Sequence, residues 1–111
     1  MLLDFWATWC GPCCREIPYL KEAYAAFSGR GFAIYAVSID HDAARWQRFL
    51  AENDLPWTNV LSPGCGKQSP AAAMYGIRFI PSNFLISPDG IIVAKNLRGE
   101  HLEEKLAEVL K

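Results

Sequence analysis

A Cys-Gly-Pro-Cys sequence follows directly on a short apolar run near the N-terminus and restricts the folds open to this chain. Residues 2–7 have the composition of a buried strand, and Pro12–Phe27 carries apolar side chains at helical spacing. Pro18 lies inside that helical pattern, where its missing N–H predicts a kink. Cys10 and Cys13 therefore stand where a strand passes into a helix, on one side of the first turn. Two sulfurs placed in this way can close a small disulfide ring.

The remaining pattern predicts an α/β fold with a mixed central sheet and helices on both of its faces. Residues 32–39 are apolar almost without alternation, which is typical of a strand covered on both sides in a parallel sheet. Either Asp40 or Asp42 can cap a second helix, and a Pro-Asp-Gly turn joins two antiparallel strands near the C-terminus. The other predicted segments are a less regular stretch from residue 55, a short helix at 71–75, strands at 83–86 and 91–94, and a final helix at 100–110.

The length and composition of the chain limit its organisation. With 111 residues it is expected to form one compact domain, residues 1–111. Its formal net charge of −1 gives no electrostatic basis for binding nucleic acid, and its apolar runs are too short to span a bilayer. A strand that begins at the first residue is unusual for a complete protein. We therefore expect a domain cut from a longer precursor or a truncated product, so the lack of a visible export signal does not identify the compartment.

The cysteines are clustered, which points to chemistry or metal binding rather than to a disulfide-stapled scaffold. Cys10 lies at the helix start, where unpaired N–H groups and the helix dipole stabilise an anion, so its thiol pKa should be lowered. Cys13 lies one turn inside and should be more buried, with a higher pKa. This asymmetry assigns the roles: Cys10 attacks a substrate disulfide, and Cys13 then resolves the mixed disulfide.

The other two cysteines are assigned lesser roles. Cys14 points about 100° away from its neighbour on a helix, so we interpret it as a small buried hydrophobe. Cys65 lies in a glycine-rich loop and is either an exposed thiol or a disulfide partner for Cys14. A zinc site would have to add Cys65 and either His41 or His101 to the first pair. That spacing matches no zinc-finger pattern, so no metal is predicted and the histidines are interpreted as surface residues.

Three segments carry a family resemblance. Asp4–Cys13, with the sequence Asp-Phe-Trp-Ala-Thr-Trp-Cys-Gly-Pro-Cys, resembles the active-site segment of the thioredoxin superfamily. Its Thr-Trp variant and the Arg-Glu-Ile-Pro at 15–18 look like the TlpA-like branch of bacterial thiol–disulfide oxidoreductases. Tyr75–Pro81 resembles the segment that carries the family's cis-proline, and residues 88–99 resemble its closing hairpin and the start of its last helix. The resemblance covers nearly the whole chain and implies a thioredoxin-like fold.

The resemblance implies roles for the residues around the cysteines. Pro81 should follow a cis peptide bond and face Cys10 and Cys13, and the backbone of Ile80 should pair with a bound substrate peptide. Trp9 should flank the cysteines as part of a flat apolar docking surface, whereas Trp6 is expected in the core. The Gly11–Pro12 dipeptide is that of thioredoxin, so it suggests a reducing potential.

Asp4 matches the buried acid that thioredoxins keep six residues before the first cysteine of the motif. Burial should raise the pKa of this carboxyl, so that it can take a proton from Cys13 during resolution. The alternative is a strand-end aspartate that points into solvent. The chain departs from the family at one point, because Ala36 stands where thioredoxin has the lysine that partners this acid.

The resemblance implies an enzyme that reduces or isomerises disulfides in other proteins, with the Cys10–Cys13 disulfide as its only redox group. Members of the TlpA-like branch are usually extracytoplasmic and often tethered to a membrane, and they receive electrons from a membrane carrier. We therefore expect a monomeric periplasmic protein with such a donor, with the cytoplasm as the alternative location. Two other functions remain open: a peroxiredoxin-like thiol peroxidase, and a non-catalytic binding module with a thioredoxin fold.

Overall fold

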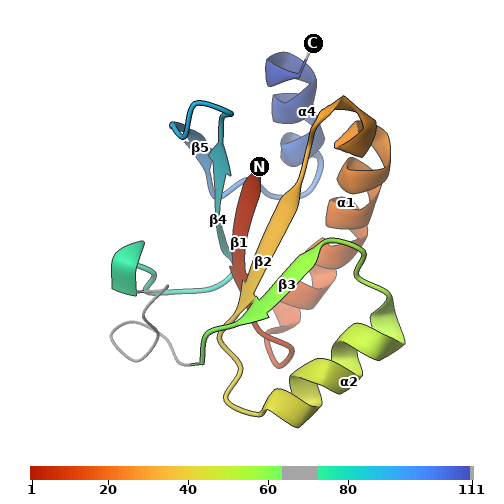
Figure 1. The fold of residues 1–111 in the computed structure, drawn as a ribbon, viewed down its shortest axis with the longest axis vertical. Helices are drawn as coiled ribbons and strands as arrows, with labels where there is room; N and C mark the ends of the chain where they lie inside the picture. The colour runs from red at the N-terminus through yellow and green to blue at the C-terminus, as the bar shows by residue number, and fades with distance from the viewer. Residues whose placement is uncertain (64–72, 111) are drawn as a thin grey trace.

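A single five-stranded sheet organises the protein, whose computed structural model describes residues 1–63 and 73–110. The strand order is β3-β2-β1-β4-β5, with β1 in the centre (Figure 1). The three strands on one side are parallel, and the two on the other side are antiparallel, so the sheet is mixed as predicted. The strands are β1 (Leu2–Trp6), β2 (Ile34–Ser38), β3 (Thr58–Leu61), β4 (Ser82–Ile86) and β5 (Ile92–Lys95).

Strand β1 places Asp4 in the middle of the sheet. Asp4 is opposite Ala36 of β2 on one side and Asn83 of β4 on the other. The parallel strands β1 and β2 end at the same edge, where the Ile39 N–H donates to the Trp6 carbonyl at 2.9 Å. The two turns that follow these strands therefore lie next to each other, and the Cys-Gly-Pro-Cys sequence begins there.

Helix α1 (Gly11–Phe27) starts directly after Cys10 and continues through Pro18 to a short 3₁₀ turn, η1 (Ser28–Arg30). The kink predicted at Pro18 of α1 stays a prediction. Helix α2 (Ala43–Asn53) is capped by Asp42, whose carboxylate accepts from the Arg45 N–H at 3.1 Å. The last helix, α4 (Glu100–Val109), follows the β4–β5 hairpin.

The three long helices all pack on the same face of the sheet. Right-handed crossovers from β1 to β2 and from β2 to β3 step in the same direction, which puts α1 and α2 on one side. Residues of all three helices share one hydrophobic cluster with alternate residues of β1, among them Leu2 and Trp6. The Trp6 ring lies 5.4 Å from that of Phe49 in α2, centroid to centroid, so Trp6 belongs to the core as expected.

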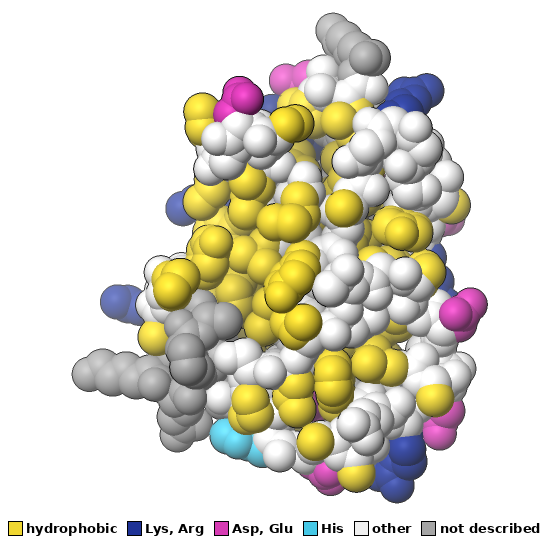
Figure 2. Space-filling model, viewed as in Figure 1, with side chains coloured by type: hydrophobic (Ala, Val, Ile, Leu, Met, Phe, Trp, Pro, Cys, Tyr) yellow, Lys and Arg dark blue, Asp and Glu magenta, His cyan; other side chains and the backbone are white. Residues whose placement is uncertain are grey.

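The opposite face holds a smaller cluster of Leu3, Phe5, Val37 and Ile77. The described segment that covers this cluster follows a helical turn at 73–74. That turn lies within the short helix predicted at 71–75, whose residues 71 and 72 lie outside the described residues. Hydrophobic side chains gather over the sheet on the face turned to the viewer in Figure 2. The described helices are thus divided unevenly between the two faces that the sequence predicted to be covered.

Most elements lie within two residues of their predicted bounds, but strand β3 was missed. Thr58–Leu61 falls in the stretch interpreted as irregular. It is a four-residue edge strand whose side chains are at best half-buried, so its sequence lacks the apolar run that marked β2. Among the helices of the described residues, none combines the length and the apolar composition needed to cross a membrane.

Candidate active site

Cys10 and Cys13 form a disulfide at the start of α1, with their Cα atoms 5.2 Å apart. Cys10 is the N-cap of the helix, and its sulfur accepts a hydrogen bond from the Cys13 N–H at 3.2 Å. Gly11 and Pro12 occupy the first turn, where proline is tolerated because this N–H has no partner within the helix. The sulfur of Cys10 therefore lies at the positive end of a 17-residue helix, which stabilises a thiolate after reduction.

The surface around the disulfide is apolar and partly exposed. The Trp9 side chain is 55% exposed, and Gly11 and Pro12 are exposed as well. Cys10 is 6% exposed and Cys13 is 3% exposed, so the predicted order of burial is correct but the contrast is small. The helix position of Cys10, rather than its exposure, distinguishes the two sulfurs.

The Ile80–Pro81 peptide bond is cis and leads into β4. Ile80 packs against the hydrophobic cluster that contains both cysteines. The guanidinium group of Arg98 donates a hydrogen bond to the Pro81 carbonyl, and the Ser82 hydroxyl donates to the Phe79 carbonyl at 2.6 Å. The loop that carries Pro81 is thus held at both ends, next to the cluster that includes the disulfide.

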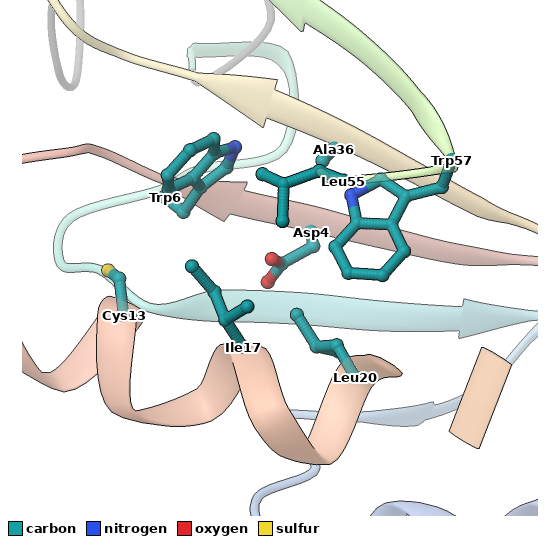
Figure 3. A pocket seen from close by; sticks show the side chains of 8 residues that line it. All are labelled: Asp4, Trp6, Cys13, Ile17, Leu20, Ala36, Leu55 and Trp57. Carbon is teal, nitrogen blue, oxygen red and sulfur yellow. The ribbon is translucent and has the colours of Figure 1, made fainter. Parts of the chain in front are cut away.

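Asp4 is buried, with 6% of its surface exposed. Asp4 and Cys13 are among the residues that line one small cavity, whose volume is about 10 Å³ (Figure 3). The carboxyl accepts no hydrogen bond from any residue that the structure describes. Burial raises its pKa from 3.8 to about 7, and the negative charge of Glu16 acts in the same direction, whereas the positive charge of Arg98 lowers it. The alternative of a solvent-facing aspartate is wrong.

Glu16 and Arg98 are charged groups near Asp4 to which the sequence analysis gave no role. The Glu16 carboxylate accepts a hydrogen bond from the Gly99 N–H at 2.9 Å, so it joins α1 to the start of α4. The Ala36 position, where the usual lysine is missing, lies directly opposite Asp4 in β2. The positive charge that lowers the pKa of this acid comes instead from Arg98, in the segment after β5. The motif at 15–18 drew attention to Glu16, but no sequence pattern linked Arg98 to the site.

A second buried acid, Asp40, ties the turn before Cys10 to the end of β2. Asp40 accepts hydrogen bonds from the Thr8 N–H at 3.0 Å, from the Thr8 hydroxyl at 2.6 Å and from the Ser38 hydroxyl. It was predicted as a possible helix cap, but its three donors hold it inside the protein and leave the cap to Asp42. Asp40 therefore fixes the path of the chain into the disulfide.

Cys14 is only partly buried and is not the simple apolar residue that was predicted. Its thiol donates a hydrogen bond to the Thr8 carbonyl at 3.5 Å. Burial raises the pKa of this thiol, and the charge of Asp40 raises it further, while Arg45 and Arg15 oppose the shift. Cys65 and its suggested disulfide with Cys14 lie outside the described residues.

No group of three or more potential metal ligands from His, Cys, Asp and Glu occurs within residues 1–63 and 73–110. His41 is exposed just before α2, as expected of a surface residue. His101 is exposed in the first turn of α4, where its Nδ1 lies 3.4 Å from a carboxylate oxygen of Glu104.

Together, the parallel βαβ units, the closing hairpin and a helix-capping disulfide define a thioredoxin-fold dithiol protein. The chain belongs to the redoxin family, whose model matches residues 1–110. This confirms the resemblance to the thioredoxin superfamily and its TlpA-like branch.

Two solved structures and one sequence relative illustrate the similarity. The thioredoxin domain of a thiol–disulfide oxidoreductase from Bacteroides vulgatus is 36% identical, with a TM-score of 0.87 over 99% of this chain and 78% of that one. A thiol–disulfide oxidoreductase from Bacteroides fragilis is 35% identical, with a TM-score of 0.87 over 98% of this chain and 80% of that one. The thiol–disulfide oxidoreductase ResA of Bacillus thuringiensis subsp. konkukian is 32% identical over all of this chain, which spans 61% of the length of that relative.

Proposed function

We propose that this protein is a thiol–disulfide oxidoreductase that reduces disulfides in other proteins. The observation that carries the proposal is the Cys10–Cys13 disulfide, with one sulfur serving as the N-cap of α1. The names of the relatives, which are thiol–disulfide oxidoreductases, support the same activity. The described form is the oxidised one, which stands at the end of a reduction cycle.

In the reduced protein, the Cys10 thiolate attacks one sulfur of a substrate disulfide. A mixed disulfide forms between Cys10 and the substrate, and the other substrate sulfur leaves as a thiolate that takes up a proton. Cys13, as a thiolate, then attacks the sulfur of Cys10. The internal disulfide forms, the bond between Cys10 and the substrate breaks, and the second substrate sulfur leaves as a thiolate that takes up a proton. The substrate has then gained two electrons and two protons.

Asp4 is the proposed proton acceptor for Cys13 in the second step. Asp4 and Cys13 line one cavity of about 10 Å³, which is roughly the room that one water molecule needs. The proposed relay is a single water in that space, which would carry the proton from Cys13 to Asp4. With a pKa of about 7, Asp4 can both accept and release a proton near neutral pH.

The proposed docking surface consists of the exposed Trp9, Gly11 and Pro12 together with the backbone of Ile80 beside Pro81. The exposed apolar ring of Phe79 extends it next to that loop. An extended peptide can pair with backbone groups while its side chains contact such apolar surface. This arrangement suits many protein substrates, since backbone pairing does not depend on one sequence.

The remaining parts of the proposal rest on the resemblance to the TlpA-like branch. The protein would act outside the cytoplasm as a monomer, and a membrane reductant would restore the Cys10–Cys13 dithiol. The internal disulfide would be its only redox group, with no metal or organic cofactor.

Reduction of insulin in the presence of dithiothreitol tests the activity. We expect Cys10→Ser to abolish turnover, and Cys13→Ser to accumulate a mixed disulfide with the substrate that mass spectrometry detects. Cys14→Ser is the matched control, because its thiol is directed to the Thr8 carbonyl, and it should keep wild-type turnover. Full turnover by Cys10→Ser would refute the proposal.

Two further measurements separate the alternatives. Consumption of hydrogen peroxide without insulin reduction would indicate a thiol peroxidase, and loss of both activities with free thiols would indicate a binding module. The equilibrium potential against glutathione then sets the direction. A value near the roughly −270 mV of thioredoxin supports a reductase, and one near about −120 mV would make the protein an oxidant.

A further inference from the structure

The charge that faces Asp4 comes from an unexpected part of the chain. In β2, the residue opposite Asp4 is the uncharged Ala36, and in β4 it is the uncharged Asn83. The guanidinium group of Arg98, which follows β5, is the positive charge that acts on this carboxyl. Arg98 is half-buried. The next residue, Gly99, donates its N–H to the Glu16 carboxylate.

Arg98 is connected to β4, the strand that borders Asp4, through its neighbour Leu97. One of its amino groups, Nη1, donates to the Leu97 carbonyl at 3.2 Å. Leu97 is itself fixed by two hydrogen bonds with the Asn83 side chain, one from its N–H and one to its carbonyl, each 2.9 Å long. The buried Asn83 thus ties the backbone next to Arg98 to the centre of the sheet.

The other amino group of Arg98, Nη2, donates to the Pro81 carbonyl. A guanidinium group can make this bond and the bond to Leu97 together because its donors form a rigid planar fork. A single side chain therefore connects the loop before β4 with the charge environment of Asp4.

We propose that Arg98 is a positioning residue with two effects: it holds the substrate loop at Pro81, and it supplies the positive charge that opposes Glu16 at Asp4. The inference rests on the proposed function, since that proposal gives Pro81 and Asp4 their roles. The bonds to Pro81 and Leu97 carry the first effect. The second rests on where Arg98 lies, because Leu97 before it is bonded to Asn83, which is opposite Asp4, and Gly99 after it is bonded to Glu16.

The charged and titratable groups that face Asp4 come from two sides. Helix α1 contributes the Glu16 carboxylate and the Cys13 sulfur, and the segment after β5 contributes Arg98. The cavity walls from β2 and from the segment before β3 are Ala36, Leu55 and Trp57, which carry no charge. Among the described residues, Arg98 is thus the only cation that lowers the pKa of Asp4.

Two substitutions separate the two effects. Arg98→Gln removes the charge and the fork, so the pKa of Asp4 should rise and the KM for a disulfide-containing peptide should increase. Arg98→Lys keeps the charge but replaces the fork with a single ammonium group, so it should increase KM while leaving the Asp4 titration close to that of the wild type.

The titration of Asp4 is measured in the oxidised full chain from the carboxyl ¹³C chemical shift, which needs no turnover. We expect an upward shift of about one pH unit in Arg98→Gln. KM should rise roughly tenfold in both variants, the size expected for a lost hydrogen bond from a charged donor. Arg48→Gln, which removes an exposed arginine of α2, is the matched control and should change neither quantity.

The outcomes distinguish this inference from the proposed function. An unchanged Asp4 titration in Arg98→Gln, or an unchanged KM in both variants, would overturn the assignment of Arg98. If Asp4 shifts as expected but Asp4→Asn resolves the mixed disulfide at the wild-type rate, the proton acceptor of the proposed function fails while the charge effect of Arg98 stands. Because Arg98→Lys keeps the charge, it supplies the KM test if Arg98→Gln does not fold.

Discussion

Two buried aspartates lie near the same disulfide and differ in what surrounds their carboxyl groups. Asp40, with 1% of its surface exposed, accepts hydrogen bonds from three donor groups of Thr8 and Ser38. Asp4, with 6% exposed, accepts none from the described residues and lies against the apolar side chains of the cavity. Burial alone therefore does not tell what an acid does in this protein.

Hydrogen-bond partners are what separates an architectural acid from a reactive one. Donors around Asp40 replace the water that it loses on folding, so its charge can be used to fix the turn before Cys10. Asp4 lacks that replacement, and its pKa moves to about 7, into the range where proton transfer is useful. The following experiments test this contrast, in order of the expected effect.

The largest expected effect is on the pH dependence of stability in Asp4→Asn. The pKa of Asp4 is raised from 3.8 to about 7, so between these values the folded chain holds a proton that the unfolded chain has lost. The stability contributed by this group is complete below about pH 4 and is lost as the pH rises through 7, by up to about 4 kcal/mol. Urea unfolding of the oxidised protein at pH 4 and pH 8 should show that Asp4→Asn loses less stability than the wild type. Equal losses of stability in the wild type and in Asp4→Asn would remove the distinction between Asp4 and Asp40.

Asp40→Ala should destabilise the protein by about 3 kcal/mol. The substitution leaves the Thr8 N–H, the Thr8 hydroxyl and the Ser38 hydroxyl without their acceptor in a buried site. Urea unfolding at pH 7 measures the loss. Asp40→Asn keeps the shape and one acceptor oxygen, so it should lose less stability than Asp40→Ala. Equal losses of stability would show that the acceptor oxygens of Asp40 are unimportant.

The third effect concerns the resolution of the mixed disulfide. Asp4→Asn should slow the attack by Cys13 by about 10²-fold at pH 7, the lower range for a lost general base, and should remove the rise in rate near pH 7. Stopped-flow tryptophan fluorescence can follow this step. Asp40→Asn leaves Asp4 in place and should retain the rise. Its disappearance in Asp40→Asn alone would mean that the two acids had been assigned to the wrong roles.

The smallest effect is expected at Asp42, an exposed acid whose carboxylate caps α2 through the Arg45 N–H. Asp42→Ala should cost about 1 kcal/mol of unfolding free energy and should leave disulfide reduction unchanged. Thermal unfolding together with the insulin assay checks both parts. A loss as large as that of Asp40→Ala would show that burial of the bonded acid adds nothing.

The sequence predicted the parts of the site that are close together along the chain. The strand before Cys10, the helix after it and the burial of Asp4 followed from apolar periodicity and from the motif, and the structure agrees. The edge strand β3 escaped because its four half-exposed residues carry too weak a pattern. Asp40 was misjudged for a related reason: its partner Thr8 is distant in sequence and lies beside it only where two parallel strands end together.

The sequence alone predicted that Cys10 opens a helix behind a buried strand, with Cys13 one turn inside, because helix and strand periodicity report on neighbours along the chain. The charges that act on Asp4, in contrast, depend on how the chain folds. Arg98 and Glu16 come from the segment after β5 and from α1, and electrostatic interactions act through space rather than along the sequence. The missing lysine at Ala36 was therefore visible in the sequence, whereas the arginine that faces the acid became visible only once the chain was folded.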